Sequence, residues 1–170
     1  MKSKKTFHLI AMAVICSLLV IPTTSFAGKK MVDFTGDWVL NESKSDLGEG
    51  RFFSAAKMSV AQDGKTITIE RTRTGRDGEE RTTQETLTLD GKDNMAETEN
   101  RSSTSTASWS DDKTSLTIKS AIKFNRQGET FEMNRTETWT LAEDGMTLTI
   151  QSDSSSARGD RSVTLVYDNK

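Results

Sequence analysis

Three short segments of the chain repeat one pattern, in which a polar turn is followed by alternating β-branched and apolar residues. They read DGKTITI at 63–69, DKTSLTI at 112–118 and DGMTLTI at 144–150. Asp-Gly supplies the positive φ that tight hairpin turns need, and strict alternation is typical of a strand with one buried face. Nothing long repeats with a helical period. The sequence therefore predicts an all-β protein built from hairpins.

The alternation and the turn signals together predict ten strands. One strand face collects the large apolar side chains, and the opposite face is rich in threonine, serine, lysine and glutamate. A single sheet with one apolar face has to cover that face. Sequential hairpins without long crossovers favour a single antiparallel up-and-down β-barrel of about 8–10 strands. The expected strands are 33–41, 57–62, 66–73, 81–89, 94–99, 104–110, 115–124, 129–141, 146–153 and 161–167.

The first 27 residues have the features of a secretory signal peptide. Three lysines precede an apolar run that Pro22 ends, and the small residues Ser25 and Ala27 precede the expected cleavage site. The apolar run is too short for a spanning helix. Cleavage near Ala27 leaves residues 28–170 as one barrel domain and predicts a periplasmic or secreted protein.

Removing residues 1–27 also removes the only histidine, cysteine and proline, which are His8, Cys16 and Pro22. The remaining chain then has no Ser-His-Asp or Cys-His catalysis, no histidine or thiolate zinc site and no disulfide. Its formal charge of −5 argues against a nucleic-acid partner and against electrostatic membrane binding. We therefore expect no enzyme, no metal and no cofactor.

Gly36-Asp37-Trp38 opens the first expected strand, and a long polar loop, NESKSDLGEGRFFSAA at 41–56, follows it. The other strands are joined mostly by short turns. This arrangement resembles the lipocalins and wider calycins, in particular the small lipocalin-like domains of bacterial envelopes. The resemblance implies that Trp38, beside Gly36, plugs the closed end of a barrel and that residues 41–56 lean over its open end. The last residues, YDNK, lack the arginine that packs on this tryptophan in lipocalins.

Several charged side chains fall on the strand face that is otherwise apolar. A packed core does not hold unpaired charges, because burying them costs too much. Two interpretations are open. In the first, these residues form an ion-pair network in a water-containing cavity that receives a ligand's polar head, as interior arginines do in fatty-acid-binding calycins. In the second, they pair with one another at the solvent-exposed rim of the barrel. If AEDG closes the next hairpin, Arg135 faces Ser152 and Glu137 faces Ile150. The charged residues concerned are Arg71, Arg73, Glu85, Arg135 and Glu137.

These observations favour a lipocalin-like protein that binds a small apolar or amphiphilic molecule in its barrel. The alternative is an envelope interaction module or inhibitor with a filled barrel and no small ligand. Resemblance of fold does not decide between them, but a cavity of about 300 Å³ or more favours the ligand. The expected ligand contacts are Arg71, Arg135 and Glu137 as polar anchors, and Phe52, Phe53, Trp109 and Phe124 as apolar contacts.

Overall fold

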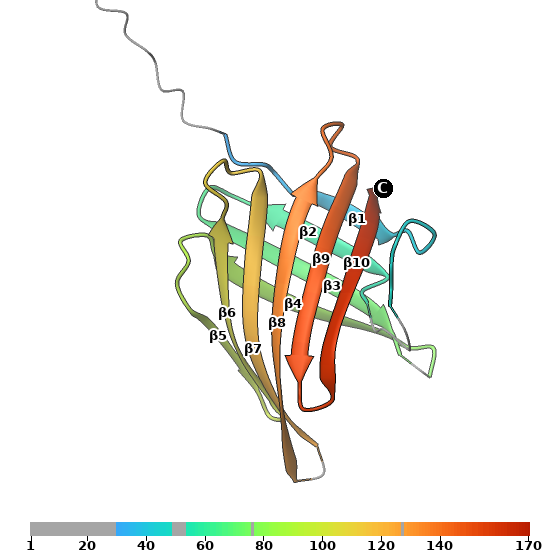
Figure 1. Ribbon diagram of the computed structural model, residues 1–170, viewed down its shortest axis with the longest axis vertical. Helices are drawn as coiled ribbons and strands as arrows, with labels where there is room; N and C mark the ends of the chain where they lie inside the picture. Colours follow the sequence, from blue (N-terminus) through green and yellow to red (C-terminus); the bar gives the residue numbers. More distant parts are fainter. Residues whose placement is uncertain (1–29, 49–53, 76, 127) are drawn as a thin grey trace, which may run out of the picture.

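A computed structural model describes residues 30–170 except 49–53, 76 and 127, and these described residues form ten strands and no helix (Figure 1). The predicted all-β class is confirmed, whereas the predicted signal peptide lies outside the described residues and stays a prediction. The strands are β1 (Gly36–Leu40), β2 (Lys57–Gln62), β3 (Thr66–Thr74), β4 (Glu80–Thr88), β5 (Asn94–Thr98), β6 (Arg101–Trp109), β7 (Ser115–Arg126), β8 (Glu129–Leu141), β9 (Thr147–Ser156) and β10 (Gly159–Asn169).

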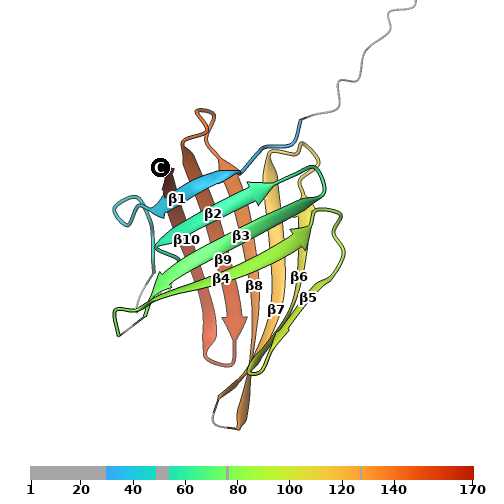
Figure 2. The ribbon, with the colours of Figure 1, turned by 180° about the vertical axis from the view of Figure 1, so that it is seen from behind.

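All ten strands belong to one antiparallel sheet in the order β4-β3-β2-β1-β10-β9-β8-β7-β6-β5. The first and last strands pair with each other, with Trp38 opposite Asn169. The sheet curls so that β1–β4 and β6–β10 face each other across the interior, which Figure 1 and Figure 2 show from opposite sides. The predicted up-and-down barrel is therefore confirmed.

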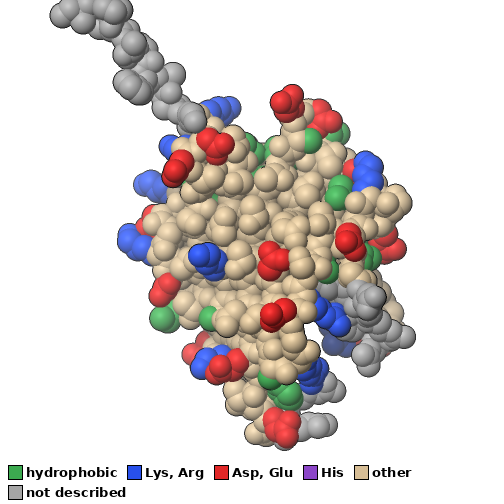
Figure 3. Space-filling view, in the orientation of Figure 1, with side chains coloured by type: hydrophobic (Ala, Val, Ile, Leu, Met, Phe, Trp, Pro, Cys, Tyr) green, Lys and Arg blue, Asp and Glu red, His purple; other side chains and the backbone are tan. Residues whose placement is uncertain are grey.

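The alternating sequence places every second side chain inside the barrel. In β3, for example, Ile67 and Ile69 are fully buried, while Thr66 and Thr68 are only partly covered on the outer face. Burial of one such aliphatic side chain is worth about 1.5–3 kcal/mol, so this inner face supplies most of the driving force for closure. The outer face over β7–β10 shows few charged side chains (Figure 3).

One end of the barrel is closed by the segment that precedes β1. The Val32 amide donates to the Lys113 carbonyl at 3.1 Å, and the Gln62 side-chain amide donates to the Val32 carbonyl at 2.9 Å. These bonds hold residues 31–35 between the β2–β3 turn and the β6–β7 turn. Phe34 of this segment is fully buried, so residues 31–35 cover this end of the barrel.

Trp38 lies directly beneath residues 31–35. Its side chain is 1% exposed, and its indole N–H donates to the Phe34 carbonyl at 3.0 Å. A Cβ on Gly36 would lie 2.8 Å from Nδ2 of Asn169 and 3.5 Å from the Trp38 ring, so glycine allows the strand end to approach closely. The closed end is thus an aromatic core that a glycine on β1 makes room for.

The barrel has one open seam, between β4 and β5. These strands follow each other in sequence, but they are the two edges of the sheet, whereas a meander of hairpins would pair them. Near the turn, the side chain of Asn94 joins the two edges: it accepts from the Thr88 amide at 3.0 Å and donates to the Ser105 carbonyl at 3.2 Å. The Asn94 side chain thus takes the Thr88 N–H that a strand ladder would have used.

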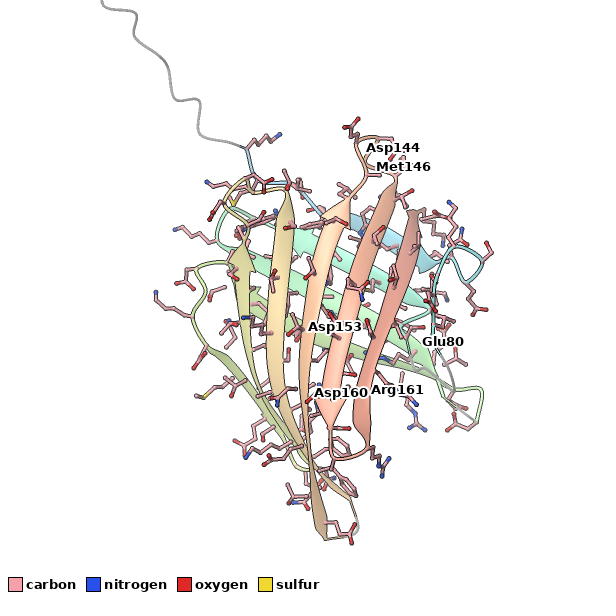
Figure 4. All side chains as sticks on the ribbon, viewed as in Figure 1. Glu80, Asp144, Met146, Asp153, Asp160 and Arg161 are labelled. Carbon is pink, nitrogen blue, oxygen red and sulfur yellow. The ribbon has the colours of Figure 1, made fainter. Side chains whose placement is uncertain are left out.

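The turn between β8 and β9 lies one residue further along the chain than the predicted AEDG loop, because the Ala142 amide donates to the Thr147 carbonyl at 2.9 Å and leaves residues 143–146 as the turn. Leu141 pairs with Leu148, and the turn projects from the end of the barrel with Asp144 and Met146 near its tip (Figure 4). The predicted register between these strands was therefore wrong by two residues. The observed inward pairs are Glu137 with Ser152 and Arg135 with Ser154.

Candidate functional site

A cavity of about 300 Å³ lies at the open seam. Strands β3 and β4 form one of its walls, and β5, β6 and β8 form the other. The wall carries four arginines and one carboxylate, and its remaining residues are small or polar, so the cavity suits a charged rather than a wholly apolar guest. The lining residues are Arg71, Arg73, Thr83, Gln84, Glu85, Ala96, Thr98, Arg101, Ser103 and Arg135.

A buried ion-pair cluster forms the inner end of this cavity. The Arg71 guanidinium donates to the Glu85 carboxylate and, at 2.8 Å, to Oε2 of Glu137. The same carboxylate oxygen of Glu137 accepts from the Trp139 indole N–H at 3.2 Å. Nε of Arg135 lies 3.3 Å from Oε1 of Glu137. Glu137 is therefore neutralised from both sides, and Arg71 is held by two carboxylates.

The electrostatics of the cluster keep its members charged. Burial raises the pKa of Glu137, but Arg71 and Arg135 lower it more, so its pKa lies below the ordinary value. Burial likewise lowers the pKa of Arg71, but Glu137 and Glu85 outweigh that effect and raise it. The cluster is therefore ionised at neutral pH, as a mutually paired set of buried charges has to be.

The lowered pKa of Glu137 predicts a pH-dependent contribution to stability. Because its folded pKa lies below its unfolded value, its stabilising effect is complete above about pH 4.3 and is lost as the pH falls through the folded pKa. The Glu137→Gln protein should therefore be less stable than the original at neutral pH, and the gap should narrow on acidification. Urea unfolding at several pH values measures this gap, and a gap that stays constant down to about pH 3 would contradict the prediction.

The mouth of the cavity carries a surplus of positive charge. Burial, followed by the neighbouring guanidiniums, lowers the pKa of Arg73 and of Arg101, although arginine remains charged at any physiological pH. Four arginines line the cavity, and Glu85 is the one carboxylate among its described lining residues. A partly enclosed site with a surplus of one sign attracts ions of the other.

Short side chains beside Arg135 keep space open inside the barrel. Across the sheet, Arg135 faces Ser120 of β7 and Ser154 of β9. Ser105 and Ser120 share a hydrogen bond of 2.9 Å between their hydroxyls and are both buried. Larger aliphatic residues at these positions would fill the space. The serines and Arg135 therefore leave the part of the interior around them polar and open.

Among the predicted polar anchors, Arg71 and Arg135 both line the cavity. Glu137 lies behind them and borders a void of only about 30 Å³ next to Tyr167. The structure therefore brings the three residues together, with Arg135 and Arg71 toward the cavity and Glu137 as their buried counter-charge. Glu85, predicted as part of the same network, completes the pairing of Arg71.

The predicted apolar contacts are more dispersed. Trp109 lies at the closed end, where its ring stacks on Phe34 with centroids 5.8 Å apart. Phe124 lies on the long β7–β8 hairpin, is 36% exposed and stacks on Phe131 at 5.3 Å. Phe52 and Phe53 lie outside the described residues.

The hollow beside Phe124 adjoins the cavity. It has a volume of about 220 Å³, and it shares Thr98 and Arg101 with the lining of the cavity. Phe124 is therefore within reach of a molecule whose polar end is held at the seam. Arg101, which both hollows share, was not among the predicted ligand contacts, because its role depends on which two strands of the sheet remain unpaired.

The described part of the loop after β1 runs along the barrel wall. Asp46 and Thr164 of β10 exchange two backbone hydrogen bonds of 2.8 Å, and the Val166 amide donates to the Ser45 hydroxyl at 2.9 Å. At the other end of the loop, Ala55 is buried and its carbonyl accepts from the Tyr167 hydroxyl at 3.0 Å. The predicted lid is thus tied to β10 at both described ends, and residues 49–53 lie outside the described residues.

Metal sites and membrane-spanning helices are both absent from the described residues, 30–48, 54–75, 77–126 and 128–170. Within them, no group of three or more His, Cys, Asp and Glu side chains is placed to hold a metal ion. No helix in the same ranges is long and apolar enough to cross a membrane.

Comparison with known proteins yields one structural likeness. No protein-family model matches the chain, and no curated protein matches it. Among solved structures, the zebrafish ileal bile acid-binding protein complexed with cholic acid is similar over 81% of this chain and 98% of that chain, with a TM-score of 0.49 and 19% identity. The fold of this chain is established by its own strand order.

Proposed function

We propose that the protein is a secreted or periplasmic lipocalin-like binding protein of the bacterial envelope that takes up a small amphiphilic anion. The acid group lies in the cavity at the seam, beside Arg135, Arg101 and Arg73, and the apolar part extends toward Phe124. The observation that carries the proposal is a cavity of about 300 Å³ whose wall holds four arginines and one glutamate. The signal-peptide pattern of residues 1–27 supports the location.

Two further observations support an anion with an apolar part. The buried Nε of Arg135 contacts Glu137, and the same side chain also lines the cavity, so its guanidinium presents a positive charge to a ligand there. Beyond Arg101, the ring of Phe124, which stacks on Phe131, lines the hollow that adjoins the cavity. A polar head at the seam and a short apolar tail on these rings would satisfy both.

The competing function, an interaction module with a filled barrel, has one observation in its favour. The upper half of the interior is packed, and the void between Met58, Ile150 and Tyr167 measures only about 30 Å³. An interaction module would bind no small molecule, so a direct binding measurement separates the two functions.

Replacing Arg135 by alanine is expected to weaken binding of octanoate by about 10- to 100-fold, because a charge-assisted hydrogen bond is worth about 1.5–3 kcal/mol. Binding of octan-1-ol, which has the same tail without the charge, should change less than about twofold. Titration calorimetry of both probes with the original and variant proteins measures the difference, and circular dichroism establishes that each variant is folded.

Lys119→Ala is the matched control. Lys119 is an exposed cation on the outer face of β7, where it pairs with Thr136 next to Arg135, so its loss removes one charge without touching the cavity. Arg101→Gln is a second test at the exposed mouth, in case Arg135→Ala fails to fold. Folded Arg135→Ala or Arg101→Gln protein that binds octanoate as tightly as the original would contradict the proposed site.

A further inference from the structure

The edge of β4 that faces the seam is long and unprotected. The nine residues of β4 keep an unbroken register with β3 on one side, and no described strand pairs with them on the other. Edge strands are usually covered, shortened, bulged or defended by lysine or proline, because a free edge accepts another strand. The sequence of β4 contains neither lysine nor proline, so this edge is a template for one more strand.

Side chains on both faces of β4 are exposed. Every side chain from Glu80 to Gln84 is exposed, whereas alternate side chains of β3, such as Ile67 and Ile69, are buried. In β5, residues 95–98 are exposed as well. The two edges diverge from the turn that connects them (Figure 2). An added strand would therefore cover side chains that the barrel itself leaves in solvent.

A row of backbone groups of β4 points into the seam. Successive residues of an antiparallel strand direct their N–H and C=O groups to opposite edges. The Leu89 amide donates to the Lys65 carbonyl at 2.8 Å, on the side of β3, and the Thr88 amide donates to Oδ1 of Asn94 across the seam. The even-numbered residues of β4 share the direction of Thr88, so their backbone groups face the seam.

An amide group already occupies one end of this row. Oδ1 of Asn94 accepts from the Thr88 amide at 3.0 Å, and its Nδ2 donates to the Ser105 carbonyl of β6 at 3.2 Å. This side chain thus bonds to both sides of the seam with the same chemistry as a peptide unit. The backbone amides of an extended peptide would continue the pattern along β4.

The residues behind the seam define the charge of such a peptide. Arg101 of β6 and Arg135 of β8 both line the cavity between the two edges. Burial and then the charge of Arg135 lower the pKa of Arg101, so a carboxylate beside these guanidiniums would offset an unfavourable approach of like charges. Ala96 and the aliphatic stems of the arginines add apolar surface for the neighbouring side chains.

We propose that the seam binds an extended peptide segment by strand addition along β4, with one acidic side chain directed toward Arg101 and Arg135. This inference goes beyond the proposed function, because the backbone of β4 holds the ligand as well as the cavity. Apolar side chains flank the acidic one on the inward face of the peptide, and its outward side chains are polar.

The heptapeptide acetyl-Thr-Val-Thr-Glu-Thr-Val-Thr-amide tests this inference, because its valines and its glutamate share one face. We expect titration calorimetry to show binding. N-methylation of alternate residues should weaken it by about 10-fold or more in at least one of the two frames, since each methyl group removes a hydrogen bond to a strand edge. Exchange of the glutamate for glutamine should also weaken it by about 10-fold, because the charge is lost.

Thr86→Pro is the matching change in the protein. The N–H of Thr86 points into the seam and not toward β3, and proline is tolerated at such edge positions. The variant should therefore fold but bind the heptapeptide at least about 10-fold more weakly, whereas Thr86→Ala should bind it as before. Both variants should bind octanoate like the original, because Thr86 is not among the described residues that line the cavity.

The inference would be overturned by absence of heptapeptide binding, by equal binding of the N-methylated or glutamine forms, or by unchanged binding to folded Thr86→Pro protein. If Thr86→Pro does not fold, the modified peptides decide. A dimer in light scattering that Thr86→Pro dissociates would assign the edge to a second copy of the chain and would also overturn it. Octanoate binding tests the proposed function separately in each case.

Discussion

Trp38→Ala is expected to lower the free energy of unfolding by about 3–5 kcal/mol, as other buried large-to-alanine changes do. The side chain is 1% exposed and packs beneath Phe34, to whose carbonyl it donates a hydrogen bond of 3.0 Å. Its loss opens a cavity at the closed end and leaves that carbonyl without its partner. Chemical denaturation followed by fluorescence and circular dichroism measures the change.

Val39→Ala serves as the control for Trp38→Ala, because Val39 is the next residue on β1 but faces outward and is 38% exposed. Its replacement should change stability by no more than about 0.5–1 kcal/mol. If the midpoint of Trp38→Ala moved as little as that of Val39→Ala, Trp38 would not seal the barrel, and the main support for the lipocalin-like closed end would be removed.

Arg71→Met is expected to destabilise the protein by about 3–5 kcal/mol, because it removes one partner from a buried ion-pair cluster and leaves the others uncompensated. Methionine keeps most of the volume and the apolar stem, so the loss reports the charge rather than a cavity. Glu137 would keep its contact with Arg135 but lose its bond to Arg71, and Glu85 would lose the bond that holds it toward the interior. Urea unfolding at neutral pH measures the effect.

Two further variants separate the ion pair from the side chain itself. Arg81→Met removes an arginine from the neighbouring strand whose side chain is 70% exposed and pairs with Asp77; exposed pairs of this kind contribute about 0–1 kcal/mol. Arg71→Met combined with Glu137→Met should recover part of the loss, since replacing both buried charges restores neutrality. A single Arg71→Met change that costs no more than Arg81→Met would show that the cluster is solvated.

The strands and the overall barrel were predictable because they depend on local patterns. Alternation marks Ile67 and Ile69 as inward-facing without reference to any other strand, and Asp-Gly marks turns through the φ that glycine allows. The pairing of β1 with β10 also follows from a closed, even-stranded meander. Phe34 falls within the predicted strand 33–41 but was not predicted as a core residue. The structure places it before β1, in a segment whose burial depends on where two distant turns meet.

Register and closure were harder to predict because both depend on contacts between strands. The AEDG loop at 142–145 is compatible with one register of β8 and β9, but the turn lies one residue later, at 143–146, which shifts the partner of Arg135 from Ser152 to Ser154. Phe124 has inward parity, yet the β7–β8 hairpin extends beyond the core, and the side chain reaches solvent. The position of a residue in the alternation determines on which face of the sheet its side chain lies, but not how far it lies from the end of the barrel.

The candidate site was therefore only half predictable. Arg71, Arg135 and Glu137 were identifiable because charged residues interrupt an apolar face, which is a signal within one strand. Arg101 gives no such signal: it follows the turn that ends β5, and it borders the cavity only because β4 and β5 remain unpaired. That seam depends on the Asn94 side chain, whose hydrogen bond to the Thr88 amide replaces a strand pairing.

The central claim is that the cavity at the seam holds a small anionic molecule, and native mass spectrometry tests it most directly. The protein would be isolated under non-denaturing conditions from the cells that produce it, alongside the Arg135→Ala variant. The account predicts an adduct of constant mass on the original protein, which dissociates as an organic acid on activation and is lost or greatly reduced in the variant. An original protein that carries no adduct and does not bind octanoate would contradict this claim.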